Sequence, residues 1–148
     1  MIVRPARGSD LAALIELTRN AGAGLTSLPA SEERMAQRVR WAELSFRGEA
    51  ERADADYLFV LETDDGKVVG ISAMTGAVGL RQPWYNYRLG LMVCASLEPR
   101  IHREIPTLFL ANDLTGSTEM CPLFLHADHR RGPHGRLLSR ARLLVLPE

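Results

Sequence analysis

Apolar residues in the first part of the chain recur at the spacing of helices that follow one short strand. Residues 2–6 have the composition of a strand, and Ser9 or Asp10 can cap a helix after it. Residues 21–30 are rich in glycine and predict a loop. Ser31 precedes two glutamates and begins a second helix. The apolar face of this second helix follows helical spacing and consists of Met35, Val39, Ala42 and Phe46.

Later residues alternate in a way that indicates strands, and one helix follows them. Residues 57–62 predict a buried strand, and Asp65-Gly66 provides a tight turn into its partner. After Pro83, apolar residues alternate through Tyr85, Tyr87, Leu89, Leu91 and Val93 on one strand face. Residues 102–113 fit either a strand or a short helix.

The end of the chain predicts a strand at 123–128 and a helix at 135–146, with Leu137, Leu138, Ala141 and Leu144 facing inward. The resulting order predicts an α/β (α+β) fold with a mixed, mainly antiparallel sheet flanked by helices.

Composition narrows the class of protein. The 148 residues suffice for one domain, 1–148, and the formal net charge is zero, which argues against a nucleic-acid partner. No apolar run has the length of a membrane span, and the N-terminus lacks a signal peptide, so we expect a cytoplasmic protein. Cys94 and Cys121 have no metal or disulfide spacing and are expected to be reduced and buried.

The final strand, loop and helix carry the clearest chemical signal. Gly132 and Gly135 allow the backbone to approach a ligand, and a helix N-terminus offers unpaired N–H groups and a positive dipole end. The P-loop and dinucleotide fingerprints are absent, whereas a pyrophosphate suits this arrangement. A glycine loop beside a solvated arginine face remains the alternative. The surrounding basic residues are Arg130, Arg131, Arg136, Arg140 and Arg142.

These residues resemble the acyl-CoA-binding motif of GNAT N-acyltransferases, although Pro133-His134 separates the two glycines. Longer segments are similar to the arginine N-succinyltransferase family: GLTSLPA, RQPWYNYR, IPTLFLANDLTGSTEMC and LFLHADHR with GRLLSR. The resemblance implies a GNAT-like fold. It also implies transfer of a succinyl group from succinyl-CoA to the α-amine of L-arginine, or of ornithine, as the first step of arginine catabolism. Family members are longer, and the likeness is to their N-terminal part, so the fold is expected to stop after the acyl-CoA-binding helix.

The resemblance also assigns residues. It places succinyl-CoA against Leu125, and the donor site is expected to comprise Leu125, Arg130, Arg131, Gly132, Gly135 and Arg136. The family's proton-donor histidine lies outside this chain, which leaves His126 as the candidate base here. Tyr85, Arg88 and Asn112 are candidates for the substrate pocket, with Arg88 suited to the succinyl carboxylate. His126, His129 and His134 do not have the spacing of a usual metal site, so we expect no metal.

Two alternatives stay open at this point. One is an acyl-CoA-dependent N-acyltransferase with a different donor or amine. The other is a non-catalytic fragment that acts only as a binding or assembly module. In either case the apolar residues 143–146 predict self-association, as a homo- or hetero-oligomer.

Overall fold

The computed structural model describes residues 1–21 and 31–146, without the side chain of Asn20. The predicted glycine-rich loop and the segment GLTSLPA at 24–30 therefore lie outside the described residues. Among the described helices, none is both long and apolar enough to cross a membrane. The main elements are β1 (Ile2–Pro5), α1 (Leu11–Asn20), α2 (Glu32–Phe46), β2 (Asp56–Glu62), β3 (Val68–Thr75), β4 (Asn86–Ser96), β5 (Ile101–Ala111), β6 (Glu119–Leu125) and α3 (His134–Ala141).

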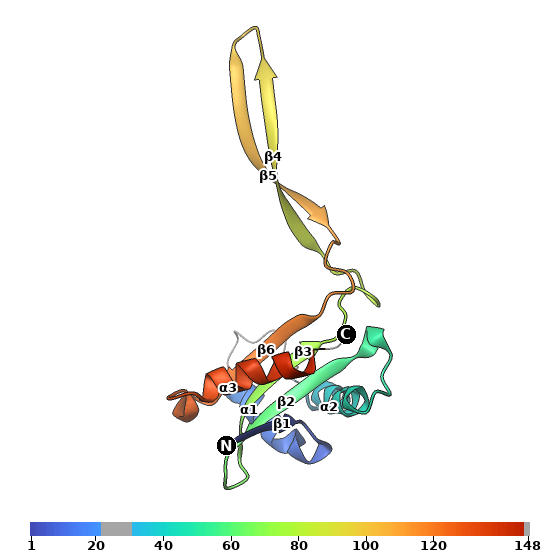
Figure 1. Ribbon diagram of the computed structural model, residues 1–148, viewed down its shortest axis with the longest axis vertical. Coiled ribbons are helices and arrows are strands. Elements are labelled where there is room, and N and C mark those ends of the chain that lie inside the picture. The colour runs from blue at the N-terminus through green and yellow to red at the C-terminus, as the bar shows by residue number, and fades with distance from the viewer. Residues whose placement is uncertain (22–30, 147–148) are drawn as a thin grey trace.

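Four strands form the central sheet, in the order β1-β2-β3-β6, and each neighbouring pair is antiparallel. Helices α1 and α2 cover one face of this sheet, and α3 crosses the other (Figure 1). We call this sheet with its three helices the body. The predicted α/β class, with a mainly antiparallel sheet flanked by helices, is confirmed.

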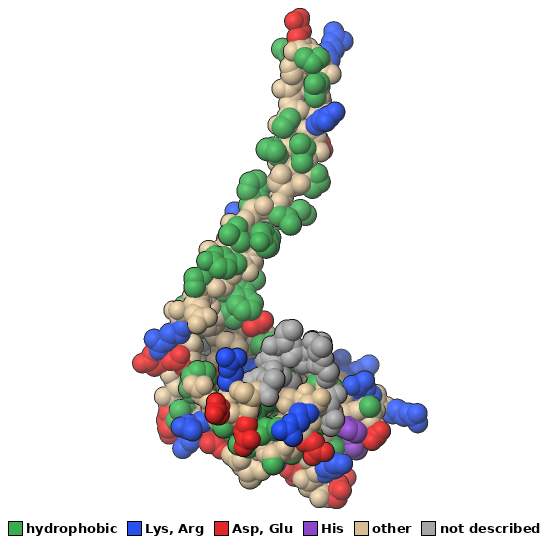
Figure 2. All heavy atoms as spheres, turned by 180° about the vertical axis from the view of Figure 1, so that it is seen from behind, with side chains coloured by type: hydrophobic (Ala, Val, Ile, Leu, Met, Phe, Trp, Pro, Cys, Tyr) green, Lys and Arg blue, Asp and Glu red, His purple; other side chains and the backbone are tan. Residues whose placement is uncertain are grey.

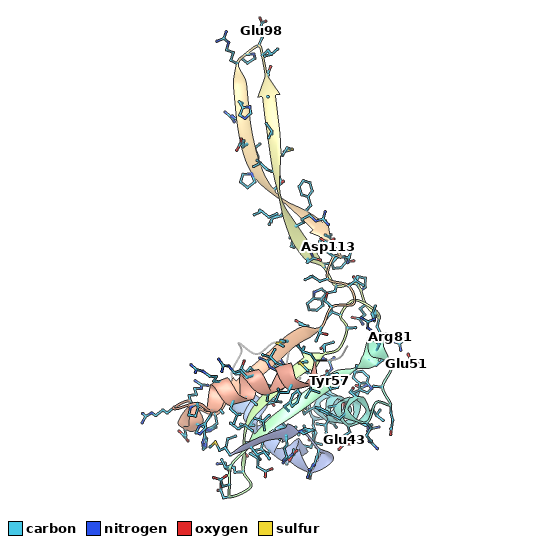
Figure 3. The ribbon with its side chains drawn as sticks, viewed as in Figure 1. Glu43, Glu51, Tyr57, Arg81, Glu98 and Asp113 are labelled. Carbon is cyan, nitrogen blue, oxygen red and sulfur yellow. The ribbon has the colours of Figure 1, made fainter. Side chains whose placement is uncertain are left out.

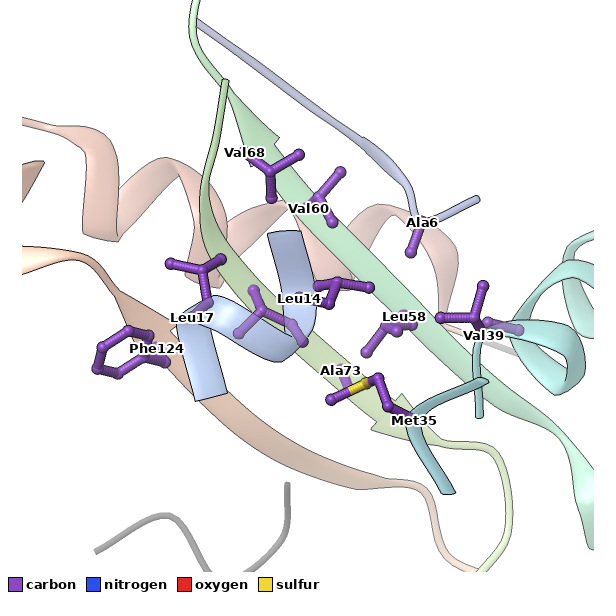
Figure 4. Close-up of a cluster of buried hydrophobic side chains, with 12 residues drawn as sticks. Ala6, Leu14, Leu17, Met35, Val39, Leu58, Val60, Val68, Ala73 and Phe124 are labelled. Carbon is purple, nitrogen blue, oxygen red and sulfur yellow. The ribbon is translucent and has the colours of Figure 1, made fainter. Parts of the chain in front are cut away.

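Each face of the sheet has its own apolar core. Leu14 of α1, Met35 and Val39 of α2, and Leu58 of β2 meet on one face, where all four side chains are buried (Figure 4). On the other face, Leu138 of α3 packs on a smaller group of buried residues from the sheet, which comprises Leu61, Val69 and Leu125. Burial of this apolar surface is the main force that joins the helices to the sheet.

The start and the apolar face of α2 agree with the sequence prediction. The Ser31 side chain accepts a hydrogen bond from the backbone N–H of Arg34 at 3.3 Å, as an N-cap residue does. Phe46, at the far end, is half-buried and makes edge-to-face contacts with the rings of Tyr57 and Phe59. The helix is thus capped at its start and packed on β2 at its end.

Strands β4 and β5 form a separate two-stranded hairpin that projects from the body (Figure 1). Residues 102–113, for which the sequence left helix and strand open, belong mainly to β5. Apolar side chains cover the hairpin along its length (Figure 2), and Leu89 is 75% exposed. Cys94 lies here and is exposed, so the expectation that it is buried was wrong.

The C-terminal helix also differs from its prediction. α3 ends at Ala141 and continues as a 3-10 turn, η4, over Arg142–Val145. α3 places Leu138 on the sheet, so Arg142, one helical turn later, also faces inward and is 7% exposed. Leu137 and Leu144 lie on the outward face, 43% and 88% exposed, so the prediction that they face inward was wrong. The Arg142 guanidinium donates to the backbone oxygens of Ser139 and Ala73, at 3.2 Å and 3.4 Å, which satisfies part of its buried hydrogen-bonding capacity.

Candidate functional site

The segment from β6 to α3 forms a turn that ends in a helix N-terminus. β6 ends at Leu125, and a 3-10 turn, η3 (Ala127–His129), leads to Gly132 and then to α3. The backbone N–H of Leu137 donates to Pro133 at 2.9 Å, which closes the first turn of the helix. The N–H groups that precede Leu137 in this turn have no intrahelical acceptor and are available to an anion.

The two glycines of this turn differ in what the fold requires of them. Gly132 has φ of +79°, a left-handed conformation that other residues adopt only with strain. Gly135 has an ordinary helical position, and a Cβ placed there would come no closer than 3.9 Å to Leu125 Cδ2. Backbone conformation therefore accounts for Gly132, whereas neither conformation nor packing accounts for Gly135. Close approach of a ligand to the backbone would explain Gly135.

The arginines around the turn have three different environments. Arg130 donates from Nε to the Leu125 carbonyl at 3.0 Å, and its guanidinium lies 5.6 Å from the centre of the Phe124 ring. Arg131 and Arg136 are exposed beside the helix N-terminus, as expected for residues that meet a phosphate. Arg142, which the sequence placed in the same cluster, is buried under the sheet instead.

Leu125 itself is a core residue, because its side chain packs with Leu138 in the second apolar cluster. Its backbone remains relevant, since β6 is an edge strand of the described sheet. The outward N–H and C=O groups of an edge strand can pair with an extended ligand. Leu125 therefore joins the candidate donor site through its main chain.

Two of the three histidines near the turn contact local backbone groups through their side chains. The backbone N–H of Asp128 donates to His126 Nδ1 at 3.4 Å, so His126 caps η3. His134 Nδ1 lies 3.3 Å from the carbonyl of His129. Among the described residues, no group of three or more His, Cys, Asp or Glu side chains could hold a metal ion. The role of His126 as a base stays a prediction.

Tyr85, Arg88 and Asn112 lie together at the base of the hairpin. Arg88 forms a bidentate pair with Asp113, at 3.1 Å and 2.8 Å, and Figure 3 shows Asp113 in this position. The pair raises the pKa of Arg88 and lowers that of Asp113. A substrate carboxylate at Arg88 would have to displace Asp113. The turn at α3 lies beyond the other end of β6, a strand of seven residues that spans about 20 Å.

A groove at the start of β6 was missed by the sequence analysis. It consists of two adjoining hollows, of about 420 Å³ and 530 Å³, between α2 and the strand ends of the sheet. Both hollows are lined by Trp41, Asp56, Thr75 and Glu119. Its size is that of a small-molecule site.

β6 begins at Glu119, before the strand predicted at 123–128, and it contains a β-bulge that alternation would not reveal. Ser72 of β3 pairs with Leu123, but Met74 pairs with Met120, so β6 carries one extra residue between the two pairs. Strict alternation would place Glu119 on the same face as Leu125, under α3. The bulge instead pairs Glu119 with Thr75, on the face covered by α2.

Comparison with known proteins places the chain in one family. A family model described as arginine N-succinyltransferase beta subunit matches residues 1–148. The chain is 72% identical over its whole length to arginine N-succinyltransferase subunit beta of Pseudomonas aeruginosa, and it covers 44% of that protein. It is 47% identical over 147 residues to arginine N-succinyltransferase of Citrobacter koseri, covering 43% of it.

A solved structure of a related subunit has the same fold. The arginine/ornithine succinyltransferase subunit AI from Pseudomonas aeruginosa matches with a TM-score of 0.86 at 35% identity, over 96% of this chain and 44% of that one. The chain belongs to the arginine N-succinyltransferase beta subunit family. It spans less than half the length of the curated relatives named above.

Proposed function

We propose that this chain takes part in transfer of the succinyl group from succinyl-CoA to the α-amine of L-arginine, with ornithine as a second acceptor. This is the first step of arginine catabolism by succinylation, in the cytoplasm. Family membership supports the reaction. The observation that carries the donor site is Gly135, a glycine in the first turn of α3 that packing does not require. Residues 1–148 would act as one domain, with no metal.

In this proposal, each part of the turn has a separate task. The N–H groups of Gly135 and Arg136 hold the pyrophosphate, and the exposed guanidiniums of Arg131 and Arg136 neutralise its charge. Arg130 fixes the turn to the Leu125 carbonyl, and Gly132 supplies the left-handed bend. The outward main chain of β6 then pairs with the amide groups of the pantetheine arm.

Transfer itself requires an uncharged amine that attacks the thioester carbonyl. The C–N bond forms as the C–S bond breaks, the amine loses a proton, and the CoA thiolate leaves and takes one up. Negative charge develops on the carbonyl oxygen in the transition state, and backbone N–H groups of the edge strand stabilise it. Holding both substrates along β6 supplies proximity. No residue of this chain corresponds to the histidine that donates a proton in the family. His126 is the candidate base in this chain.

Calorimetric titration of CoA into the chain tests the donor site. Gly135→Ala leaves the thermal midpoint close to that of the wild type and weakens CoA binding about tenfold or more, because the new methyl group keeps the phosphate from the backbone. Gly8→Ala is the matched control. A Cβ at Gly8 would also meet nothing closer than 3.9 Å, and Gly8 begins a 3-10 turn near the N-terminus, in a different part of the chain from α3. Equal affinity of Gly135→Ala and wild type would exclude this turn as the donor site.

We also propose that the protein works as an oligomer and that the hairpin contacts a second copy of the chain. The names of the relatives describe subunits, "subunit beta" and "subunit AI". The face that carries Tyr87, Leu89 and Leu108 is strongly exposed, and an isolated two-stranded hairpin is only marginally stable in water. Charged residues of both signs lie near the tip of the hairpin: Glu98, Arg100, Arg103 and Glu104.

A further inference from the structure

The groove beside α2 contains one carboxylate that the fold does not use. Asp56 is held by Arg38, whose Nε and Nη2 lie 2.9 Å and 3.3 Å from its two oxygens. Glu119 is only half-buried, and within the described residues no ion pair joins it to a cation. Its carboxylate accepts a hydrogen bond from the Cys121 thiol, with Sγ 3.5 Å from Glu119 Oε2.

The electrostatics of the groove favour a cation at Glu119. Burial raises the pKa of Asp56, and Arg38 offsets part of this effect, so the pair contributes little net negative charge. Burial and the neighbouring Glu119 carboxylate raise the pKa of the Cys121 thiol, which therefore stays protonated at neutral pH. Glu119 is thus the carboxylate whose charge is left to attract a cation.

Aromatic and basic side chains complete the groove. Trp41 of α2 lines both hollows and is 40% exposed. An indole face beside a carboxylate suits a guanidinium, which stacks on aromatic rings and binds carboxylates with a planar fork. Arg34, in the first turn of α2, lines the same hollow as Glu119 and offers a partner for a ligand carboxylate. Together these groups match an amino acid with a basic side chain.

The position of the groove agrees with this ligand. It lies at the start of β6, whereas the turn proposed for the donor follows the end of β6. The bulge between Met120 and Leu123 is adjacent to the groove, and bulges occur often next to active sites because they redirect side chains. A donor bound along the edge strand would therefore point its acyl end toward the groove.

We propose that this groove binds the acceptor amino acid, with the Glu119 carboxylate on the guanidinium of L-arginine and the Trp41 indole stacked against it. This assignment rests on the proposed function, and it differs from the earlier candidates Tyr85, Arg88 and Asn112. It makes Glu119 a specificity-determining residue for a basic side chain. L-Citrulline, which has a neutral urea group of similar shape, lacks the charge that Glu119 recognises.

The test is calorimetric titration of the chain with L-arginine and with L-citrulline. Wild type binds L-arginine at least about tenfold more tightly than L-citrulline, as expected for a charge-assisted contact. Glu119→Gln weakens L-arginine binding about tenfold or more and removes the preference over L-citrulline. Trp41→Ala weakens L-arginine binding less than Glu119→Gln does. Trp41→Phe, which keeps an aromatic ring, binds L-arginine more tightly than Trp41→Ala.

Glu51→Gln is the matched control. Glu51 is an exposed carboxylate paired with Arg81 at 2.9 Å near the groove, where Figure 3 shows both residues, yet it does not line the hollows. Its variant is expected to bind L-arginine as wild type does. Circular dichroism verifies that each variant is folded.

The outcomes separate the two proposals. Undiminished L-arginine binding by Glu119→Gln overturns the groove assignment, and so does a wild type that shows no binding of L-arginine at millimolar concentration. If that same wild type binds CoA, the donor site stands and only the groove assignment fails. If wild type binds L-arginine through Glu119 but does not bind CoA, the groove assignment is supported and the proposed donor site fails.

Discussion

The body and the hairpin have similar strand sequences and opposite surroundings. In β2, Leu58 is fully buried beneath α1 and α2, whereas in β4, Leu89 is 75% exposed. Both strands are rich in apolar residues, and both pair with an antiparallel neighbour over their length. The difference shows that an apolar pattern determines the type of element, whereas the neighbouring elements determine whether its side chains stabilise the fold of one chain.

The largest contrast in stability is expected from one leucine in each region. Leu58→Ala should lower the free energy of unfolding by about 3 kcal/mol, because it leaves a cavity in a packed core. Leu89→Ala should change it by less than about 0.5 kcal/mol. Urea denaturation followed by circular dichroism measures both. Similar losses in the two variants would show that the hairpin is part of the cooperative core.

The hairpin should have its effect on association instead. Leu89 and Leu108 are paired neighbours on one face. The double variant Leu89→Ser and Leu108→Ser should weaken self-association roughly 100-fold, because two leucines lose their burial at the interface. Analytical ultracentrifugation over a concentration series measures this change. A wild type that stays monomeric at high concentration would contradict the role of the hairpin. Glu49→Gln, at an exposed site on the body, is the control.

Removal of an ion pair should also lower stability more in the body than in the hairpin. Arg4 holds Asp10 at 2.7 Å and 2.8 Å and also bonds Glu62, and this arrangement lowers the pKa of Asp10. Asp10→Asn should lower the free energy of unfolding by about 2 kcal/mol at neutral pH. The loss is limited because Arg4 keeps the Glu62 carboxylate as a partner. Asp113→Asn, in the exposed pair with Arg88, should change stability little.

The pH dependence gives the sign of the Asp10 contribution. A lowered folded-state pKa stabilises the protein above the unfolded value of about 3.9, and the contribution is lost as pH falls through the folded value. Asp10→Asn should therefore flatten the loss of stability below about pH 4 in thermal melts. Asp113→Asn should change the curve much less, because solvent screens the exposed pair that lowers the pKa of Asp113. An unaltered acid limb in Asp10→Asn would contradict this account of the pair.

Two strand glycines provide the smallest contrast. A Cβ at Gly70 would lie 2.9 Å from Leu138 Cδ2 and 3.0 Å from Leu125 Cδ1, both in the packed second core. Gly70→Ala should therefore cost about 1–2 kcal/mol. A Cβ at Gly90 would lie 2.6 Å from the Phe109 ring, but this side chain is exposed on the hairpin and can rotate away. A larger loss of thermal stability for Gly90→Ala than for Gly70→Ala would reverse the comparison.

Sequence periodicity predicted the parts of the fold whose burial is local. The apolar face of α2, its cap at Ser31 and the antiparallel pairing of β2 with β3 follow from residues near one another in the chain. Three features had no such signal. The orientation of α3, with Leu138 on the sheet, turned Arg142 inward and Leu144 outward, and the body left the hairpin with Cys94 uncovered.

The third feature was the groove. A single extra residue in β6 moved Glu119 to the face of α2, and only the register of β3 with β6 reveals it. For the candidate donor site, the sequence predicted the start of α3 to within one residue, whereas β6 lies earlier than the predicted strand and residues 127–129 belong to the turn. Its ligand assignments remain predictions, because no contact within the fold tests them.

Amide chemical-shift mapping with succinyl-CoA tests the central claim most directly. The account predicts that the ligand shifts the backbone amides of Leu125, His134, Gly135 and Arg136, at the end of β6 and the start of α3. The amides of β4 and β5 should stay in place. Absence of any shift at the start of α3, or shifts confined to the hairpin, would contradict a succinyl-CoA site at this turn.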